Sequence, residues 1–233
     1  MPDFSKRSYQ KEILDQDDIP FEDIKENMRE LNIINQKLGG HSITLEGCRQ
    51  FLSQKTTSPL MITEIGCGGG DNLAAIYTFF KKINQFFSFT GIDIKQSCID
   101  YAMQQYSQLN ATWIANDYRE VNFTEQPHII FSSLFCHHFT NEELIFMLRW
   151  MKENSILGFF INDLQRHPLA WFLIKRITKL FSKSYLVKND APVSVTRGFT
   201  KKEWEQLLKQ AGIKNYSVKW KWAFRYLIVV KNG

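Results

Sequence analysis

Hydrophobic positions in the middle of the chain fall into two alternating patterns, short continuous runs and longer segments with helical spacing. The continuous runs predict strands at 60–65, 87–93, 111–115, 127–132 and 156–162. The helical spacing predicts helices near 71–83, 96–108 and 140–152. Strands that alternate with helices favour a parallel sheet. We therefore predict an α/β fold with a doubly wound, mostly parallel sheet and helices on both of its faces.

The chain ahead of this core predicts a polar arm and two helices. Residues 1–18 are polar and have no clear period, which indicates a loose arm that could order against the rest. Apolar residues with helical spacing predict a helix over Phe21–Leu38, and a second helix is predicted over Ser42–Gln54. The stretch 56–59 would then form the linker into the core.

The chain after the fifth strand departs from the alternation. Residues 163–198 form an insertion, in which Leu169–Phe181 has the spacing of an amphipathic helix and 183–196 has no strong period. A capping box then begins a helix at Thr200. The chain closes with two alternating or apolar runs that would pair as a hairpin, at 214–221 and 224–231.

The first predicted strand leads directly into a glycine-rich loop. Glu64, Gly66, Gly68 and Gly70 match the pattern acid-x-Gly-x-Gly-x-Gly in full, whereas a dinucleotide-binding fingerprint would need a glycine at the position of Asp71. Glycine permits a positive φ and lets a ligand lie directly against the backbone, because it has no Cβ. The loop therefore predicts the floor of a ligand site.

Acidic residues also follow the next two predicted strands. Asp93 ends the second strand, where its carboxylate could accept two hydrogen bonds from a ribose diol. Asn116, Asp117 and Tyr118 follow the third strand. Since the carboxyl ends of parallel strands meet at one edge of the sheet, these side chains are expected near the glycine loop.

These motifs, in this order over about residues 60–160, resemble the class I S-adenosylmethionine-dependent methyltransferases. Within that class, the chain is similar to the small-molecule branch that includes the ubiquinone- and menaquinone-biosynthesis enzymes, which are methyltransferases of type 11/25. The resemblance implies a Rossmann-like, seven-stranded sheet whose last strand is antiparallel, and the predicted terminal hairpin agrees with it. It implies S-adenosyl-L-methionine as cofactor and S-adenosyl-L-homocysteine as its product.

The resemblance also implies which residues surround the cofactor. Gly66 and Gly68 would lie against its methionine part, Asp93 would bind the ribose and Asp117 would meet the adenine amino group. The full set of cofactor positions carried over is Glu64, Gly66, Cys67, Gly68, Gly70, Asp93, Ile94, Asn116, Asp117, Tyr118, Ser132 and Ser133.

Methyl transfer from a sulfonium asks the protein to align the acceptor, to exclude water and to deprotonate a hydroxyl or acidic carbon. His137 and His138 follow the fourth strand, beside the expected cofactor loop, and could accept a proton near neutral pH. We take both as candidate catalytic residues; alternatively, this segment only packs over the cofactor. No metal site is predicted, because two adjacent histidines cannot readily bind one ion through both rings while Cys136, the residue before them, binds it as a third ligand.

Candidate substrate-binding residues follow the fifth strand. Asp163 and Arg166 could orient the acceptor, or they could pair with each other and cap the helix of the insertion. We interpret 163–198 as a lid whose aromatic face, including Trp171, lines an apolar cavity. Its lysines would face solvent or anionic lipid headgroups, so peripheral membrane contact through the basic lid stays open. The alternative is a covered core edge with a solvated face.

Composition bounds the remaining possibilities. The length of 233 residues suits one large domain with a cap. We predict that residues 1–55 form an N-terminal arm and helices that are part of a substrate cap. Residues 56–233 would form the cofactor-binding core. The net charge of +5 allows contact with anionic partners without requiring it. The four cysteines are scattered, and the N-terminal residues are polar, so neither a disulfide framework nor a signal peptide is predicted. We expect a cytoplasmic location.

Two functions remain open. The first is an enzyme that methylates oxygen or an activated carbon of a small hydrophobic, aromatic acceptor, such as a phenol, quinone or polyketide. The second is a non-catalytic regulatory or partner subunit that binds the cofactor. Nucleic acid is disfavoured as a substrate, because Ser132–Phe135 lacks the acid-Pro-Pro-aromatic motif of nucleobase enzymes and Cys136 follows Phe rather than Pro. No oligomeric state is predicted.

Overall fold

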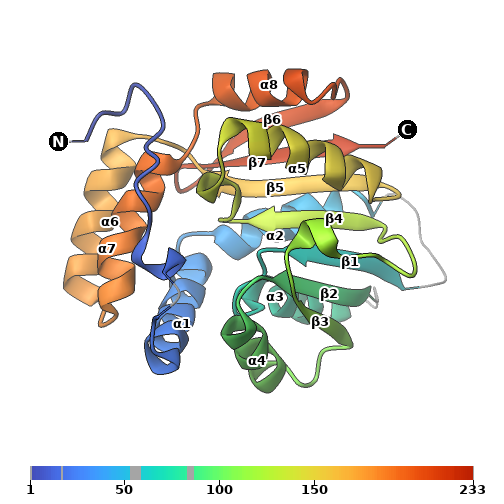
Figure 1. Ribbon diagram of the computed structural model, residues 1–233, viewed down its shortest axis with the longest axis horizontal. Helices are drawn as coiled ribbons and strands as arrows, with labels where there is room; N and C mark the ends of the chain where they lie inside the picture. The colour runs from blue at the N-terminus through green and yellow to red at the C-terminus, as the bar shows by residue number, and fades with distance from the viewer. Residues whose placement is uncertain (1, 17, 53–58, 83–86, 233) are drawn as a thin grey trace.

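The computed structural model describes residues 2–16, 18–52, 59–82 and 87–232, and its centre is one seven-stranded sheet (Figure 1). The strand order is β3-β2-β1-β4-β5-β7-β6. All neighbours pair in parallel except β7, which runs antiparallel to both β5 and β6. The strands are β1 Leu60–Ile65, β2 Phe87–Asp93, β3 Ala111–Ala115, β4 Ile129–Ser133, β5 Gly158–Leu164, β6 Tyr216–Lys221 and β7 Arg225–Lys231.

The predicted α/β fold is confirmed, including the terminal hairpin and the antiparallel last strand. Apolar packing on both faces explains why the central strands appear in the sequence as continuous apolar runs. Successive side chains of β5 point to opposite faces, so Phe159 and Ile161 join one hydrophobic core and Phe160 joins the other. Helices cover each core and make the sheet the middle of three layers.

The helices that the alternation predicts lie against this sheet. One core lies beneath α5 and α8, and the other lies beneath α2 and α3, while α4 packs against β2 and β3. A capping box begins α5 at Thr140 and another begins α8 at Thr200. The bounds are α2 Gly40–Arg49, α3 Asp71–Lys81, α4 Gln96–Gln105, α5 Asn141–Glu153 and α8 Lys201–Gln210.

A cap forms over one end of the sheet, at the left in Figure 1, from segments far apart in the sequence. Its parts are the N-terminal arm and the two helices of the insertion, which pack against each other, together with the first long helix. One short 3-10 turn lies in the arm, and two others follow β3 and β4. The bounds are η1 Ile13–Asp15, α1 Phe21–Lys37, η2 Tyr118–Glu120, η3 Cys136–His138, α6 Pro168–Phe181 and α7 Tyr185–Arg197.

The helix α7 occupies the stretch for which the sequence predicted no element. Its buried residues lie on several sides, because α6, α1 and the arm all pack against it. A helix covered on several sides has no single polar face, and Pro192 inside it further weakens the helical pattern. The arm is ordered, since the backbone N–H groups of Ile13 and Leu14 donate to the Asp190 carboxylate of α7 at 2.8 and 2.9 Å.

Some predictions concern parts of the chain that the structure does not describe. The linker at 56–59 and the boundary between residues 55 and 56 fall on or beside residues 53–58, and the predicted helix end at 83 also lies outside the described residues. Within the described ranges, every helix is too short or too polar to cross a membrane.

Candidate active site

The glycine loop leaves its backbone open at one position. Gly66, Gly68 and Gly70 have φ values of 66°, 50° and 79°, in the left-handed region that favours glycine. Packing requires a glycine at two of these positions. A Cβ on Gly66 would lie 2.1 Å from the Phe135 ring, and a Cβ on Gly70 would lie 2.6 Å from the Trp113 ring. A Cβ at Gly68 would first meet the sulfur of a flexible methionine at 3.5 Å. The backbone at Gly68 is thus accessible to a ligand.

The acid at the end of β2 is bonded to this loop. Oδ2 of Asp93 accepts a hydrogen bond from the N–H of Gly68 at 2.8 Å, and Oδ1 accepts one from the N–H of Lys95 at 2.9 Å. Burial raises the pKa of Asp93, although these two backbone bonds oppose the rise. The neighbouring Ile94 side chain is 71% exposed, which provides an apolar surface beside the carboxylate.

A second acid lies beneath the loop. Glu64 is fully buried, and burial raises its pKa well above the usual value, with the charge of Asp71 adding to the rise. Its Oε1 accepts a hydrogen bond from the Asn72 amide at 2.9 Å, while its Oε2 is buried without a partner among the described residues. The open backbone, the β2 carboxylate, the apolar surface and the orphaned oxygen fit an adenosyl group with a charged amino-acid tail.

The remaining predicted cofactor positions lie around this loop or near it. Cys67 is a buried thiol within the loop, and Tyr118 is buried against Phe135, the ring that covers Gly66. At the end of β4, Ser133 accepts a hydrogen bond from Asn162. The other three positions contact residues close by in the sequence. Asp117 accepts a hydrogen bond from the Arg119 side chain, and Asn116 accepts one from the N–H of Asp117. The Ser132 hydroxyl is hydrogen-bonded to the Cys136 thiol.

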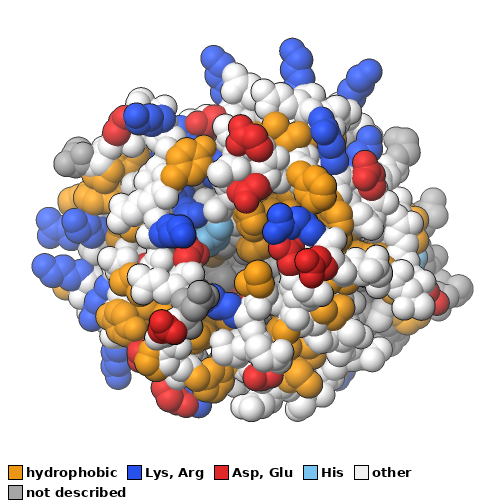
Figure 2. Space-filling model, viewed as in Figure 1, with side chains coloured by type: hydrophobic (Ala, Val, Ile, Leu, Met, Phe, Trp, Pro, Cys, Tyr) orange, Lys and Arg blue, Asp and Glu red, His pale blue; other side chains and the backbone are white. Residues whose placement is uncertain are grey.

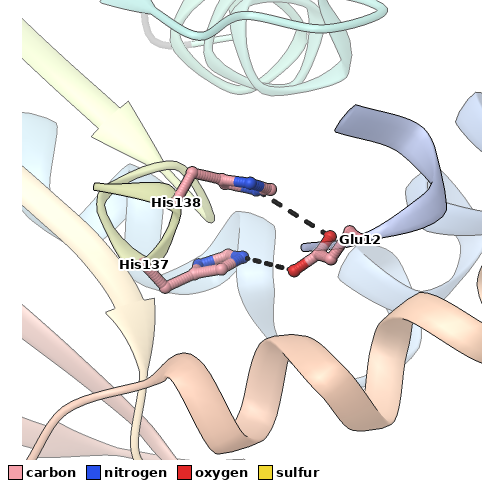
Figure 3. A group of neighbouring side chains, drawn as sticks. All are labelled: Glu12, His137 and His138. Atoms are coloured by element: carbon pink, nitrogen blue, oxygen red, sulfur yellow. Dashed lines mark ion pairs between the residues drawn. The ribbon is translucent and has the colours of Figure 1, made fainter. Parts of the chain in front are cut away.

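The two candidate histidines point toward one carboxylate of the N-terminal arm (Figure 3). His137 Nε2 is 3.5 Å from Oε1 of Glu12, and His138 Nε2 is 3.9 Å from Oε2. The other ring nitrogens also meet carboxylates: Nδ1 of His137 lies 2.8 Å from Oδ1 of Asp163, and Nδ1 of His138 lies 3.0 Å from Oδ1 of Asp15. Each imidazole is therefore held between two acids.

The burial of this cluster sets its protonation. Burial alone would lower the pKa of His137, but the charge and hydrogen bond of Asp163, followed by those of Glu12, raise it to about 9. Burial would raise the pKa of both carboxyls, and the histidine instead holds them below their usual values. At neutral pH, His137 is thus an imidazolium between two carboxylates. Asp163 fixes the proton on Nδ1 and leaves Nε2 as the nitrogen that exchanges.

Glu12, His137 and His138 are also the one group of three potential metal ligands among the described residues, with ligand atoms within 4.8 Å of one another. Cys136 is not part of this group, since its buried thiol lies beside Ser132 and Met147. The Glu12 carboxylate already accepts a hydrogen bond from Ser194 at 2.7 Å and faces a charged imidazole. The absence of a metal site stays a prediction.

An apolar cavity of about 240 Å³ opens beside this cluster. Aliphatic side chains of α1, α6 and α7 line its walls, and Leu134 and Leu164 line it at the ends of β4 and β5. Figure 2 shows a hollow near the centre of this face, with a histidine in it and hydrophobic and charged side chains around it. The polar residues of the lining are Glu12, Asn27, His137, His138, Asp190, Ser194 and Arg225.

The predicted substrate-binding residues lie in three different places. Asp163 is buried beneath His137 and does not line the cavity. Arg166 pairs with Glu203 of α8 at 2.8 Å, and Trp171 packs edge-on against Phe4 of the arm, so both side chains lie outside the cavity lining. The insertion contributes other residues of α6 to the cavity, namely Leu173, Ile174 and Ile177.

Five polar residues of the cavity lining were not predicted from the sequence, namely Glu12, Asn27, Asp190, Ser194 and Arg225. Glu12 lies in an arm without periodicity, where several acids were equally plausible. Asn27 and Arg225 carry buried donor atoms, Nδ2 and Nη1, that have no hydrogen-bond partner among the described residues. The available signals were an asparagine among the apolar positions of α1 and a basic residue directly ahead of the apolar strand β7.

Comparisons with known proteins give a domain and a fold. Residues 62–154 match a family model described as a methyltransferase domain. No curated protein sequence matches the chain. The fold is similar to that of the plantazolicin methyltransferase BpumL in complex with SAH, with a TM-score of 0.63 at 18% identity over 90% of this chain and 99% of that chain.

Two further solved structures share the fold. Human N-acetylserotonin methyltransferase in complex with SAM has a TM-score of 0.63 at 17% identity, over 91% of this chain and 56% of that chain. Magnesium protoporphyrin IX methyltransferase from Synechocystis PCC 6803 with bound SAH has a TM-score of 0.57 at 13% identity, over 84% of both chains.

The matched residues include the glycine loop, the acid that ends β2 and the histidines that follow β4. Of these, the glycine loop and the acid that ends β2 have the geometry that fits an adenosyl ligand. Residues 62–154 therefore form a methyltransferase domain, the chain has the fold of the class I S-adenosylmethionine-dependent methyltransferases, and the geometry of its glycine loop fits that cofactor.

Proposed function

We propose that the protein methylates an oxygen or an activated carbon of a small hydrophobic, aromatic acceptor that binds in the apolar cavity. The observation that carries this proposal is a buried histidine in the wall of a cavity with aliphatic sides, paired with a carboxylate that lies beneath it. Since an apolar cavity of about 150 Å³ holds a benzene ring, the volume of about 240 Å³ suits a substituted ring. A phenol, a quinol or a polyketide-like ring has the required shape and an ionisable group.

The chain's own residues would perform three tasks. When bound, S-adenosylmethionine supplies an activated methyl group on a positively charged sulfur. The loop at Gly68 and the Asp93 carboxylate would hold the cofactor, and Met28 of α1, the side chain nearest to Gly68, would shield it from water. His137 accepts the acceptor's proton at Nε2, while Asp163 holds its Nδ1–H. The Glu12 carboxylate stabilises the resulting imidazolium.

The alternative function, a cofactor-binding subunit without catalysis, predicts the same glycine loop. The buried His137–Asp163 pair favours an enzyme, because a protein that only binds cofactor needs no proton acceptor in a cavity wall. Calorimetric titration with the cofactor, followed by assays with phenolic and quinol acceptors, separates the two functions. Tight cofactor binding, without turnover of any acceptor and with a protein partner recovered by pull-down, would favour the non-catalytic subunit.

The position of the cofactor site predicts a loss of affinity in Asp93→Ala. The substitution removes charge-assisted hydrogen bonds to the sugar, so cofactor binding should weaken by roughly 1.5–3 kcal/mol in isothermal titration calorimetry. Asp100→Ala is the matched control, because that carboxylate is exposed and bonds only to the Gln96 side chain among described residues. Equal affinities for Asp93→Ala and the wild type would place the cofactor elsewhere.

The two histidines should differ in their effect on turnover. His137→Gln should lower kcat by about 10²–10⁴-fold with cofactor affinity unchanged, because it removes the proton acceptor. His138→Gln is the matched control: its ring is more exposed, and it bonds to Asp15 instead of Asp163. Similar activities of both variants would retire the assignment. A chelator should leave the wild-type rate unchanged, and a metal-dependent recovery after chelation would assign the cluster to a cation instead.

The rate should also follow the neutral fraction of His137. Because the pKa of His137 is raised to about 9, the rate should rise about tenfold per pH unit above pH 7 and level off near pH 9. Glu12→Gln removes a carboxylate, which lowers this pKa and moves the profile to lower pH. A profile that is flat between pH 6 and 9, or that Glu12→Gln leaves in place, would contradict the proposal.

The same pKa shift makes a prediction about stability that does not depend on turnover. The folded pKa of His137 lies above its ordinary value of 6.5, so its protonation contributes to the free energy of unfolding fully below about pH 6.5. That contribution should be lost as the pH rises through about 9. Urea unfolding of the wild type and His137→Gln should therefore show a difference in stability that shrinks between pH 6.5 and 9.

We also propose that α6 contacts anionic lipid surfaces. It exposes five large apolar residues, with exposed fractions of 49% for Leu169, 44% for Phe172, 39% for Leu173, 74% for Leu180 and 80% for Phe181. Lysine and arginine side chains project at the left edge of Figure 2, where α6 lies in Figure 1. Apolar side chains beside basic ones suit the boundary between acyl chains and anionic headgroups. The basic residues on or beside α6 are Lys175, Arg176, Lys179 and Lys183.

Sedimentation with liposomes tests this contact. Binding should require anionic lipid and weaken as salt rises, since salt screens exposed charges. The double variant Leu180→Ser, Phe181→Ser should bind less, whereas Phe146→Ser on α5, which removes a side chain that is 50% exposed, should not. Binding that neither lipid charge nor salt affects would remove the proposal.

A further inference from the structure

A buried arginine without a counter-ion lines the acceptor cavity. Arg225 begins β7, and its side chain is 3% exposed. Its Nη2 donates to Oδ1 of Asn35 at 3.0 Å, whereas its Nη1 is buried without a hydrogen-bond partner in the described part of the chain. Since a buried guanidinium normally pairs with an acid or a set of oxygens, Nη1 marks a place where an oxygen acceptor is missing.

No ion pair among the described residues cancels the charge of this arginine. Burial lowers the pKa of Arg225 to about 10, with Asp163 and Asp71 opposing that effect, so the guanidinium stays charged at neutral pH. Neither carboxylate forms an ion pair with it. The buried guanidinium groups of Arg166 and Arg197, by contrast, pair with Glu203 and Asp15. Arg225 is therefore a buried cation whose partner has to come from outside the described chain.

The N-terminus of α2 lies next to the unpartnered nitrogen. A Cβ built on Gly40, the first residue of α2, would lie 3.0 Å from Nη1 of Arg225. The N-cap residue, Gly39, offers no side chain to cap the helix. The first N–H groups of a helix attract anions, and here they have no side-chain acceptor at the N-cap. Two independent features, a helix terminus and a buried cation, thus meet at one point.

Asn35 positions the guanidinium and connects it to the cofactor loop. Its Oδ1 accepts from Arg225, and its Nδ2 donates to Oδ2 of Asp71 at 3.1 Å, where α3 begins after the glycine loop. His41 Nε2 lies 2.7 Å from the same oxygen. The arginine is therefore held from one side, and its free nitrogen is left for a ligand.

We propose that Arg225 and the N-terminus of α2 form a carboxylate-binding site, which takes a carboxylate of the methyl acceptor. This proposal rests on the proposed function, in which the cavity holds the acceptor. The cavity side of Arg225 favours the acceptor as the source of the carboxylate, since Arg225 lines the cavity together with aliphatic residues of α1 and α6. The acceptor class is thus an aromatic carboxylic acid. The amino-acid carboxylate of the cofactor is the second source with the same chemistry.

Direct binding tests the site without any need for turnover. Calorimetry would measure the affinities of the wild type and of Arg225→Met for two pairs of probes. Binding of the first pair would be measured in the presence of S-adenosylhomocysteine. The first pair is 4-hydroxybenzoate and its neutral analogue 4-hydroxybenzamide. The second pair is S-adenosylhomocysteine and 5′-methylthioadenosine, which lacks the amino-acid carboxylate. Arg149→Met is the matched control, because Arg149 lies on the surface and bonds to the backbone of Gln210.

The expected result is that Arg225→Met weakens 4-hydroxybenzoate roughly tenfold to a hundredfold and leaves 4-hydroxybenzamide unchanged. A loss confined to S-adenosylhomocysteine would keep the carboxylate site and assign it to the cofactor. If Arg225→Met binds each of the four probes as tightly as the wild type does, the proposed carboxylate site is wrong. If the wild type binds 4-hydroxybenzoate more tightly than 4-hydroxybenzamide through Arg225 but methylates no acceptor, the result counts against the proposed function and not against the carboxylate site.

Thermal unfolding separates a binding role from a structural one. Removal of an unpaired buried charge should leave the melting temperature of the ligand-free protein unchanged or raise it. The stabilisation by 4-hydroxybenzoate should disappear in Arg225→Met and partly return in Arg225→Lys, which restores the charge. A large drop in melting temperature without ligand, with ligand stabilisation retained, would assign Arg225 a purely structural role.

Discussion

The contact between His137 and Asp163 joins the sheet to the cavity, and the arrangement of the site depends on it. Asp163 lies near the end of β5 and is fully buried, and His137 follows β4, the strand next to it. A buried carboxylate needs a cationic partner, and the imidazole supplies it at 2.8 Å. The bond fixes one ring nitrogen and leaves the other to face Glu12 at the cavity wall. A structural ion pair thereby also determines which ring nitrogen faces the cavity wall.

The N-terminal arm completes this arrangement from outside the core. Arg7 is buried and donates to the carbonyl oxygens of Phe139 and Arg197, which ties the arm to the turn that carries the histidines. The arm then presents Glu12 to both imidazoles. The second carboxylate therefore reaches His137 from a segment that is separate from the sheet. The arm thus adds to the rise in the pKa of His137 that Asp163 of β5 causes, while β4 and β5 fix the position of the ring.

The core and the cofactor loop could be predicted from the sequence because their signals are local. The apolar runs of buried strands and the glycines of the loop each follow from constraints within a few residues. The loop shows a limit of that inference, since Gly66 and Gly70 are glycines partly because Phe135 and Trp113 pack against them. Those contacts are long-range and leave no pattern near the loop itself.

The cap could not be predicted to the same degree. The helix α7 has no polar face because it is covered on several sides, and Glu12 and Arg225 reach the cavity from opposite ends of the chain. Arg166 and Trp171 lie in the predicted lid but point to Glu203 and Phe4, which a helical pattern cannot show. Sequence distance hides such contacts, and only the packing of α1, α6 and α7 brings the polar residues together.

Titration of the histidine ring nitrogens by nuclear magnetic resonance tests the central claim most directly, because it observes His137 without acceptor or cofactor. The account predicts that His137 carries protons on both nitrogens at pH 7, loses the Nε2 proton near pH 9 and keeps the Nδ1 proton that is bonded to Asp163. A His137 ring that is neutral at pH 7, or that keeps its proton on Nε2 at high pH, would contradict it.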